Sequence, residues 1–135
     1  MNIRLDHEHV NLLIEESQRM HPIEACALLF GEFTEDGAFV RKVTVLQNEL
    51  HSAERFEMNP ESVYKAFNEA EKDGFEFIGI FHSHPAPATP SIADLKFMKI
   101  WGDALWLILS LTDHRLGAYQ LKNGELREIE IKYEK

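Results

Sequence analysis

Residues 79–94 read GIFHSHPAPATPSIAD, and this stretch carries the strongest structural signals in the chain. It closes an apolar run that begins at Phe75, which predicts a buried strand. Alternate residues of a strand point to the same face, so we expect His82 and His84 to present their imidazoles side by side. Pro85 ends the strand and leaves both side chains at an open end of a sheet, where binding sites tend to form.

The second half of the stretch predicts a helix that begins at Ser91 and stops at Gly102. Ser91 followed three residues later by Asp94 matches a capping box, in which the serine accepts from a backbone amide and the acid reaches back. Asp94 is equally suited to give a carboxylate oxygen to an ion held by the two histidines. A fourth tetrahedral position would then remain for water, as in catalytic zinc sites. Capping and metal binding remain open alternatives at this point.

Helix and strand signals alternate along the rest of the chain. Asp6 is placed to cap a helix that Pro22 ends. Asn59, followed by a proline, predicts the start of a second helix that stops at Gly74. Strands are predicted at 2–5, 23–30, 39–46, 55–58, 75–82, 105–111, 116–121 and 125–133.

The last two predicted strands flank Asn123 and Gly124, a pair typical of a two-residue hairpin turn. The strand at 105–111 is almost wholly apolar, which predicts a central position covered on both faces. Interleaved helices and strands indicate an α/β fold class: a single domain over residues 1–135 with a mixed β-sheet flanked by helices.

Composition narrows the classes of function. The chain has 135 residues, of which 44% are hydrophobic and 27% charged, as expected for one globular domain with a core. Acidic residues outnumber basic ones by 23 to 14, and the basic ones are scattered, which argues against nucleic-acid binding. No apolar stretch approaches the roughly 20 residues that span a bilayer, and the start lacks signal-peptide features, so we expect a cytoplasmic protein. Cys26, the only cysteine, is expected to be a buried hydrophobe.

Glu24 interrupts an otherwise apolar segment, IEACALLF. Burying a carboxylate is costly unless it faces a polar cleft or a partner. One interpretation places Glu24 on the solvent side at the start of a strand. The other makes it the general base that a hydrolytic metal site requires. Sequence spacing alone does not bring Glu24 and His82 together.

In combination, these residues closely resemble the JAMM, or MPN-plus, metalloprotease family. The family pattern is a glutamate in an early strand, then HSHP, then serine and aspartate three apart at a helix start. Segments similar to the family occur in family order and cover most of the chain: HPIEACALLFG, RFEMNPESVYKAF and HSHPAPATPSIADL. The resemblance implies the MPN/JAMM, cytidine-deaminase-like fold in its minimal prokaryotic form.

The resemblance implies a role for each residue that matches the pattern. His82, His84 and Asp94 would bind one Zn²⁺ together with a water, Glu24 would hold that water and shuttle its proton, and Ser91 would steady the oxyanion. Mn²⁺, Fe²⁺ or Co²⁺ could fill the same ligand set. One departure stands out, since six residues separate His84 from Ser91, one fewer than in the family pattern.

Family members cleave bonds after the glycine-rich tail of ubiquitin-like proteins, or process sulfur-carrier proteins with the same tail. The resemblance therefore implies a zinc metallopeptidase of the isopeptidase type, with such proteins and their conjugates as partners. The segment between Gly102 and Leu105 is too short for the metal-binding insertion of some eukaryotic relatives. Residues 47–58 are the expected place of substrate contact, with a solvated connection as the alternative.

Other classes of protein share part of this pattern. Amidohydrolase and phosphoesterase barrels also carry HxH at a strand end, but they need roughly 200 or more residues. Cupins carry HxH as well, yet they lack helices like the two predicted at 59–74 and 91–101. The remaining alternative is a catalytically inactive MPN-type scaffold that binds ubiquitin-like partners. The other histidines, His7, His9, His21, His51 and His114, are dispersed and expected at the surface.

Overall fold

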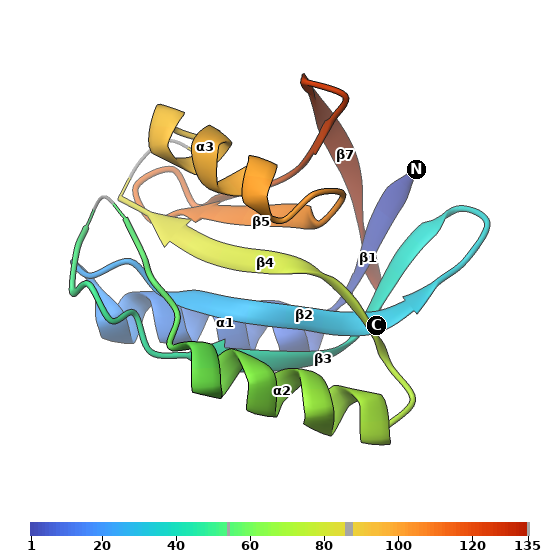
Figure 1. Cartoon of the computed structure of the whole chain (residues 1–135). Coiled ribbons are helices and arrows are strands. Elements are labelled where there is room, and N and C mark those ends of the chain that lie inside the picture. Colours follow the sequence, from blue (N-terminus) through green and yellow to red (C-terminus); the bar gives the residue numbers. More distant parts are fainter. Residues whose placement is uncertain (54, 86–87, 135) are drawn as a thin grey trace.

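A computed structural model describes residues 1–53, 55–85 and 88–134, which form seven strands and three helices (Figure 1). The strands are β1 (Asn2–Asp6), β2 (Cys26–Phe33), β3 (Gly37–Leu46), β4 (Glu76–His84), β5 (Leu105–Ser110), β6 (Arg115–Lys122) and β7 (Glu125–Glu134). The helices are α1 (His7–Met20), α2 (Pro60–Lys72) and α3 (Ile92–Ile100). All three predicted helices are therefore confirmed.

The strands form one mixed sheet in the order β1-β3-β2-β4-β5-β6-β7, which closes on itself where β7 pairs with β1. Three pairs are parallel, β1 with β3, β1 with β7 and β4 with β5, and the other pairs are antiparallel. The predicted α/β class with a mixed sheet and flanking helices is confirmed. Closure of the sheet goes beyond the prediction, because no local pattern encodes which edges meet.

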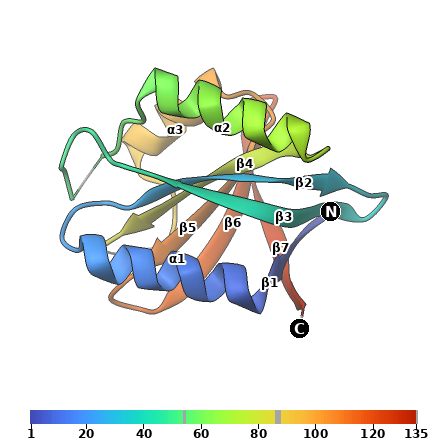
Figure 2. The same cartoon turned by 90° about the horizontal axis from the view of Figure 1, so that it is seen from below.

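The helices lie on two sides of the strands (Figure 2). Helix α1 packs on one side, and α2 and α3 lie together on the other. Strand β5 contributes side chains to the core on each side of the sheet. Leu105, Leu107 and Leu109 join the core around α1, and Trp106 and Ile108 join the core under α2 and α3. This two-sided burial confirms the predicted central strand. The histidines of β4 point to the α2 and α3 side. His82 pairs with Ile108 of β5, whose side chain faces that side, and His84 lies two residues further along on the same face.

Local signals fix the ends of the helices. The Asp6 side chain accepts from the backbone N–H of Glu8, and the Asn59 side chain accepts from those of the first turn of α2. Gly74, with a φ of +80°, follows α2 as predicted. These caps satisfy amide groups that have no partner inside a helix. The predicted caps are thus confirmed.

Two predicted boundaries are wrong. Strand β2 runs over Cys26–Phe33, later than the predicted 23–30, so Glu24 precedes the strand. Gly31, one residue past the predicted end of this strand, lies inside it at a register shift, where a Cβ would collide with the backbone oxygen of Phe39. Close backbone approach explains this glycine.

The predicted strand at 55–58 is also wrong, since these residues form no ladder with any described strand. Phe56 and Met58 are buried against the core beneath α2 and α3, and their alternation with polar neighbours imitates a strand. The hairpin at Asn123 and Gly124 is confirmed, with φ values of +54° and +80°.

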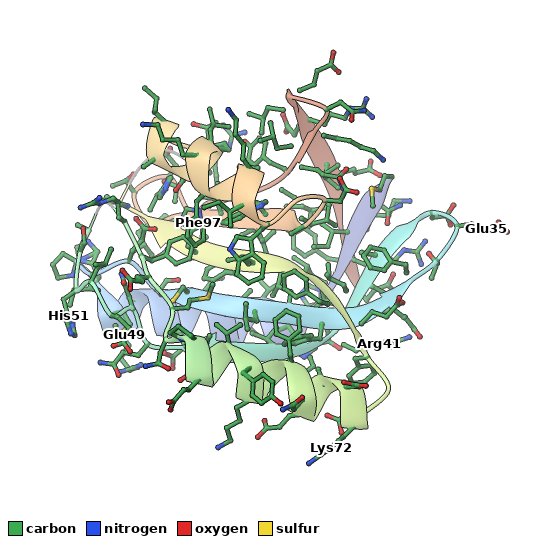
Figure 3. The ribbon with its side chains drawn as sticks, in the orientation of Figure 1. Glu35, Arg41, Glu49, His51, Lys72 and Phe97 are labelled. Atoms are coloured by element: carbon green, nitrogen blue, oxygen red, sulfur yellow. The ribbon has the colours of Figure 1, made fainter. Side chains whose placement is uncertain are left out.

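Most charged side chains lie on the outside of the molecule, as Glu35, Arg41 and Lys72 do in Figure 3, whereas Phe97 of α3 points toward β4. Four of the five dispersed histidines are exposed, and His9 is half-buried. Cys26 is 1% exposed, which confirms its place in the core. Among the described residues, no helix combines the length and apolar character needed to cross a membrane.

Candidate metal centre

Strand β4 brings the two histidines together. It runs through His84, two residues beyond the predicted end, and its parallel pairing with β5 sets His84 beside Ser110. The rings of His82 and His84 lie 4.7 Å apart between centroids, on the same side of the strand as predicted. Both are buried, with relative exposures of 0% and 6%.

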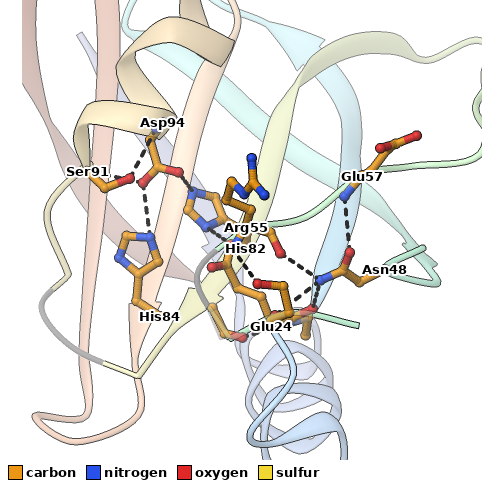
Figure 4. Close-up of polar contacts among 11 residues, drawn as sticks. Glu24, Asn48, Arg55, Glu57, His82, His84, Ser91 and Asp94 are labelled. Carbon is orange, nitrogen blue, oxygen red and sulfur yellow. Dashed lines mark hydrogen bonds and ion pairs between the residues drawn. The ribbon is translucent and has the colours of Figure 1, made fainter. Parts of the chain in front are cut away.

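Helix α3 presents Asp94 to this pair. Asp94 Oδ2 lies 3.0 Å from His84 Nε2, and Asp94 Oδ1 lies 3.7 Å from His82 Nε2 (Figure 4). The predicted capping box is also present, because Ser91 Oγ accepts from the Asp94 amide at 3.1 Å and the Ser91 amide donates to Asp94 Oδ2 at 2.9 Å. Capping thus aims the carboxylate of Asp94 at the histidines, so the two interpretations of this pair are compatible.

Glu24 completes the cluster from a distant part of the sequence. Antiparallel pairing of β2 with β4 aligns Cys26 with His82, which places the residues just before β2 beside the histidines. Glu24 Oε1 lies 2.8 Å from His82 Nδ1, and the glutamate is 1% exposed. The solvent-side interpretation of Glu24 is therefore wrong.

These four residues, Glu24, His82, His84 and Asp94, offer ligand atoms that all lie within 4.8 Å of one another. Among the described residues, both nitrogens of His82 and both carboxylate oxygens of Glu24 lack a partner with hydrogen-bond geometry, despite their short contact. Buried polar atoms of this kind are costly unless something else engages them. Two neutral imidazoles and two carboxylates also sum to a charge of −2. The donor set therefore fits a divalent cation.

The environment keeps the Asp94 carboxylate ionised. Burial by itself would raise the pKa of Asp94, but the hydrogen bond from His84, the neighbouring His82 and the Ser91 amide together lower it below its ordinary value. An ionised oxygen is the form that binds a metal ion.

Aromatic side chains enclose His82. The Phe56 ring stacks on it with a centroid distance of 4.8 Å, and the Trp106 ring meets it edge-on at 6.0 Å. An apolar wall lowers the local polarity and strengthens electrostatic interactions in the site. Phe56 belongs to the predicted contact region at 47–58, but its stacking on His82 was not predicted.

A cleft of about 480 Å³ opens beside the cluster, with Asp94 in its wall. It lies between the loop that follows β3 and helix α3, and its lining includes the side chains of Leu50, Arg55, Ile92 and Phe97. Leu50 is 41% exposed and Ile92 is 77% exposed, so the cleft offers apolar surface to a binding partner. The predicted contact region at 47–58 thus forms one side of a cleft that reaches the cluster.

Two further polar residues near the site were not predicted. Ser83, whose side chain points away from those of the histidines because alternate strand residues face opposite sides, is buried and accepts from the Ala25 amide at 2.8 Å. Asn48, in the loop after β3, is fully buried and contacts the backbone of Glu24 (Figure 4). The shortened connection between His84 and Ser91 includes residues 86 and 87, which lie outside the described residues.

Comparisons with known proteins agree with the fold and the motif. Residues 6–123 match the family described as prokaryotic homologs of the JAB domain. A desampylase of Pyrococcus furiosus is 45% identical over 89 residues, 65% of this chain and 60% of the relative. A desampylase of Haloferax volcanii is 28% identical over 118 residues, 84% of this chain and 80% of that protein. The chain thus spans less than two thirds of the Pyrococcus relative.

Solved structures show the same architecture. The solution structure of a Desulfitobacterium hafniense protein superposes with a TM-score of 0.89 at 31% identity, covering 98% of this chain and 93% of that one. A Salinibacter ruber protein superposes with a TM-score of 0.73 at 25% identity, covering 99% and 92%. With most of its length matched, the chain belongs to the family of prokaryotic homologs of the JAB domain.

Proposed function

We propose that this chain is a zinc-dependent isopeptidase that hydrolyses the bond after the C-terminal glycine-rich tail of ubiquitin-like or sulfur-carrier proteins. The observation that carries the proposal is the buried cluster of two histidines and two carboxylates, one of which, Asp94, lines a cleft. Membership in the JAB family supports it, as do two relatives whose name, desampylase, denotes removal of a small protein modifier. Residues 1–135 would act as one catalytic domain.

One zinc ion per chain would be held by His82, His84 and Asp94. Imidazole nitrogen and carboxylate oxygen suit zinc, and three protein ligands are typical of its catalytic sites. When bound, zinc would supply Lewis-acid activation of a water and of the scissile carbonyl. Strand β4 and the capped start of α3 would fix the three side chains in advance of binding.

Glu24 would act as general base and then as general acid. Its carboxylate is buried at the cluster, and neither oxygen has a hydrogen-bond partner among the described residues. Beside its 2.8 Å contact with His82 Nδ1, the carboxylate would be placed to take a proton from the attacking water and to give one to the departing amine. General acid and base catalysis of this kind contributes about 10²- to 10⁴-fold in rate.

Ser91 would stabilise the oxyanion that forms at the scissile carbonyl. Its Oγ accepts from the Asp94 amide, which uses a lone pair and leaves the hydroxyl proton available. A hydroxyl that caps the helix is also held in place by the cap. Removal of one such donor costs about 10²- to 10³-fold in turnover in other hydrolases.

The cleft would receive the substrate tail in an extended form. Glycines at the end of such a tail carry no side chain, so they would let the tail approach Asp94 closely between the loop and α3. The apolar side chains of Leu50 and Ile92 at the rim would contact the residues that precede the glycines.

The decisive assay offers the purified protein three substrates: a linear ubiquitin-like fusion, an isopeptide conjugate and a sulfur-carrier conjugate. We expect cleavage directly after the tail, loss of cleavage with a chelator, and recovery when zinc is restored. Cleavage that a chelator leaves unchanged would contradict the proposal. Tight binding without cleavage of any of the three would favour the catalytically inactive scaffold instead.

A further inference from the structure

Asn48 is a fully buried polar residue in the irregular loop between β3 and α2. Its neighbours Gln47 and Glu49 are exposed, so the asparagine alone turns inward. The Asn48 amide nitrogen lies 3.0 Å from the Glu24 carbonyl oxygen, 3.0 Å from that of Arg55 and 3.5 Å from that of Ser52. Two amide protons are thus shared among three carbonyls.

The Asn48 side-chain oxygen is equally occupied. It accepts from the Leu50 amide at 3.0 Å and from the Glu57 amide at 3.1 Å. A side-chain amide has two donors and one oxygen with two lone pairs, so Asn48 uses its whole capacity. The residue therefore closes the loop on itself and fastens it to Glu24.

Glu24 depends on this loop because it lies outside the β2 ladder. Its carbonyl accepts from Asn48, and its amide donates to the Ser52 carbonyl at 2.8 Å. Both backbone groups of Glu24 are thus held by the same loop. On the next residue, the Ala25 amide donates to Ser83 Oγ, which ties the chain to β4. These contacts fix the backbone from which the Glu24 side chain reaches His82.

The other end of the loop reaches the histidines. Arg55, whose carbonyl accepts from Asn48, is followed directly by Phe56, the ring that stacks on His82. Arg55 also lines the cleft, and its backbone amide donates to Ser52 Oγ at 3.3 Å. One side chain therefore connects the position of Glu24, the aromatic cover of His82 and one wall of the cleft.

We propose that Asn48 is a positioning residue for the reaction: its amide holds the loop residues 48–53 and 55–57 against the backbone of Glu24 and thereby orients the Glu24 carboxylate. This inference rests on the proposed function, because it concerns the geometry of the same site. Asn48 is neither a candidate ligand nor a residue of the cleft lining, and it contacts Glu24, Leu50 and Arg55 through their backbone atoms. Its effect on turnover is therefore indirect, through Glu24 and the loop.

The test compares Asn48→Ala and Asn48→Asp with Gln120→Ala. Gln120 is a matched control, since it is also a buried amide that donates to a backbone carbonyl, that of Asp103, at the opposite end of β5 from the site. Asn48→Asp keeps an acceptor for Leu50 and Glu57 but turns an oxygen toward the carbonyls of Glu24 and Arg55.

We expect both Asn48 variants to bind zinc at the wild-type stoichiometry and to lose about 100-fold in turnover, more in kcat than in KM, because a misplacement of about 1 Å has an effect of that size. The Gln120→Ala variant loses stability but keeps kcat per folded, zinc-loaded molecule. An Asn48→Ala variant that loses stability yet keeps its kcat would overturn the positioning role.

A second measurement is independent of enzymatic activity. Trypsin cleaves after arginine, and the Arg55 carbonyl is bound to Asn48 in the native loop. We expect native-state cleavage after Arg55 to accelerate at least tenfold in Asn48→Ala and to stay at the wild-type rate in Gln120→Ala, with sites mapped by mass spectrometry. Equal rates in all three proteins would overturn the inference. If trypsin cleaves Asn48→Ala faster but the wild-type protein cuts no conjugate, then Asn48 does hold the loop in place, and the proposed function is refuted.

Discussion

The histidine half of the candidate site and the glutamate half are held by different kinds of structure. His82 and His84 lie on β4, which is paired with β2 on one side and β5 on the other, and Asp94 lies in the first turn of a capped helix. Glu24 precedes its strand and is held by a loop through Asn48 and Ser52. Regular structure thus fixes the candidate ligands, whereas irregular structure fixes the candidate base. The two halves are expected to respond differently to substitution.

The largest effect is expected in the histidine half. His84→Ala removes a ligand, so we expect loss of zinc and a fall in turnover of at least about 10³-fold, since several kcal/mol of stabilisation are lost. Zinc binding is measured by mass spectrometry. Binding of added Co²⁺ is followed by quenching of Trp106 fluorescence, because the Trp106 ring lies 6.0 Å from His82. His114→Ala, an exposed histidine, is the control. Zinc retention by His84→Ala would contradict the ligand assignment.

Ser91 is expected to separate capping from catalysis. Ser91→Ala and Ser91→Gly both remove the hydroxyl donor, so both should lose about 10²-fold in kcat. They differ in stability, because an alanine N-cap costs about 1 kcal/mol and a glycine only a few tenths. Ser91→Thr keeps both functions. If kcat instead followed the stability of the three variants, the serine would act only as a cap.

Ser83 links the two halves, and a smaller effect is expected there. Ser83→Ala leaves the buried Ala25 amide without its acceptor, which costs about 1–3 kcal/mol in the free energy of unfolding. We expect kcat to fall about tenfold, since the Ser52 and Asn48 contacts of Glu24 remain. Denaturant unfolding and steady-state kinetics measure both quantities. Ser17→Ala, a buried serine in α1, should lose stability without a change in kcat.

The smallest effect concerns Cys26, which pairs with His82 across the ladder. Burial, followed by the charges of Glu24 and Glu49, raises the pKa of the Cys26 thiol to about 12. The thiolate is therefore scarce below about pH 9 in the folded state. Iodoacetamide should leave Cys26 intact at pH 8 and label it readily after unfolding. Rapid labelling of the native protein would place the thiol outside the core.

Much of the histidine half could be predicted because its signals are local. The alternation of His82 and His84, the proline after them, and the pair Ser91 and Asp94 all lie within sixteen residues. Strand geometry and capping chemistry convert those spacings directly into positions. The helix N-caps at Asp6 and Asn59 were predictable for the same reason.

The position of the glutamate half could not be derived from spacing, because its contacts are long-range, and only the family resemblance assigned Glu24 to the site. Glu24 reaches His82 only through the antiparallel register of β2 and β4, which pairs Cys26 with His82, 56 positions further along the chain. Asn48 has no sequence signal that distinguishes it from its exposed neighbours. Phe56 and Met58 imitate a strand because both are buried, but closure of the sheet leaves no edge there for them to join.

The measurement that tests the central claim most directly is the zinc content and turnover of Glu24→Gln on a ubiquitin-like conjugate. Glutamine keeps the size of the side chain but cannot accept and return a proton. We predict that the variant retains about one zinc per chain and loses about 10²- to 10⁴-fold in turnover. Turnover at the wild-type rate would contradict the assignment of Glu24 as the base.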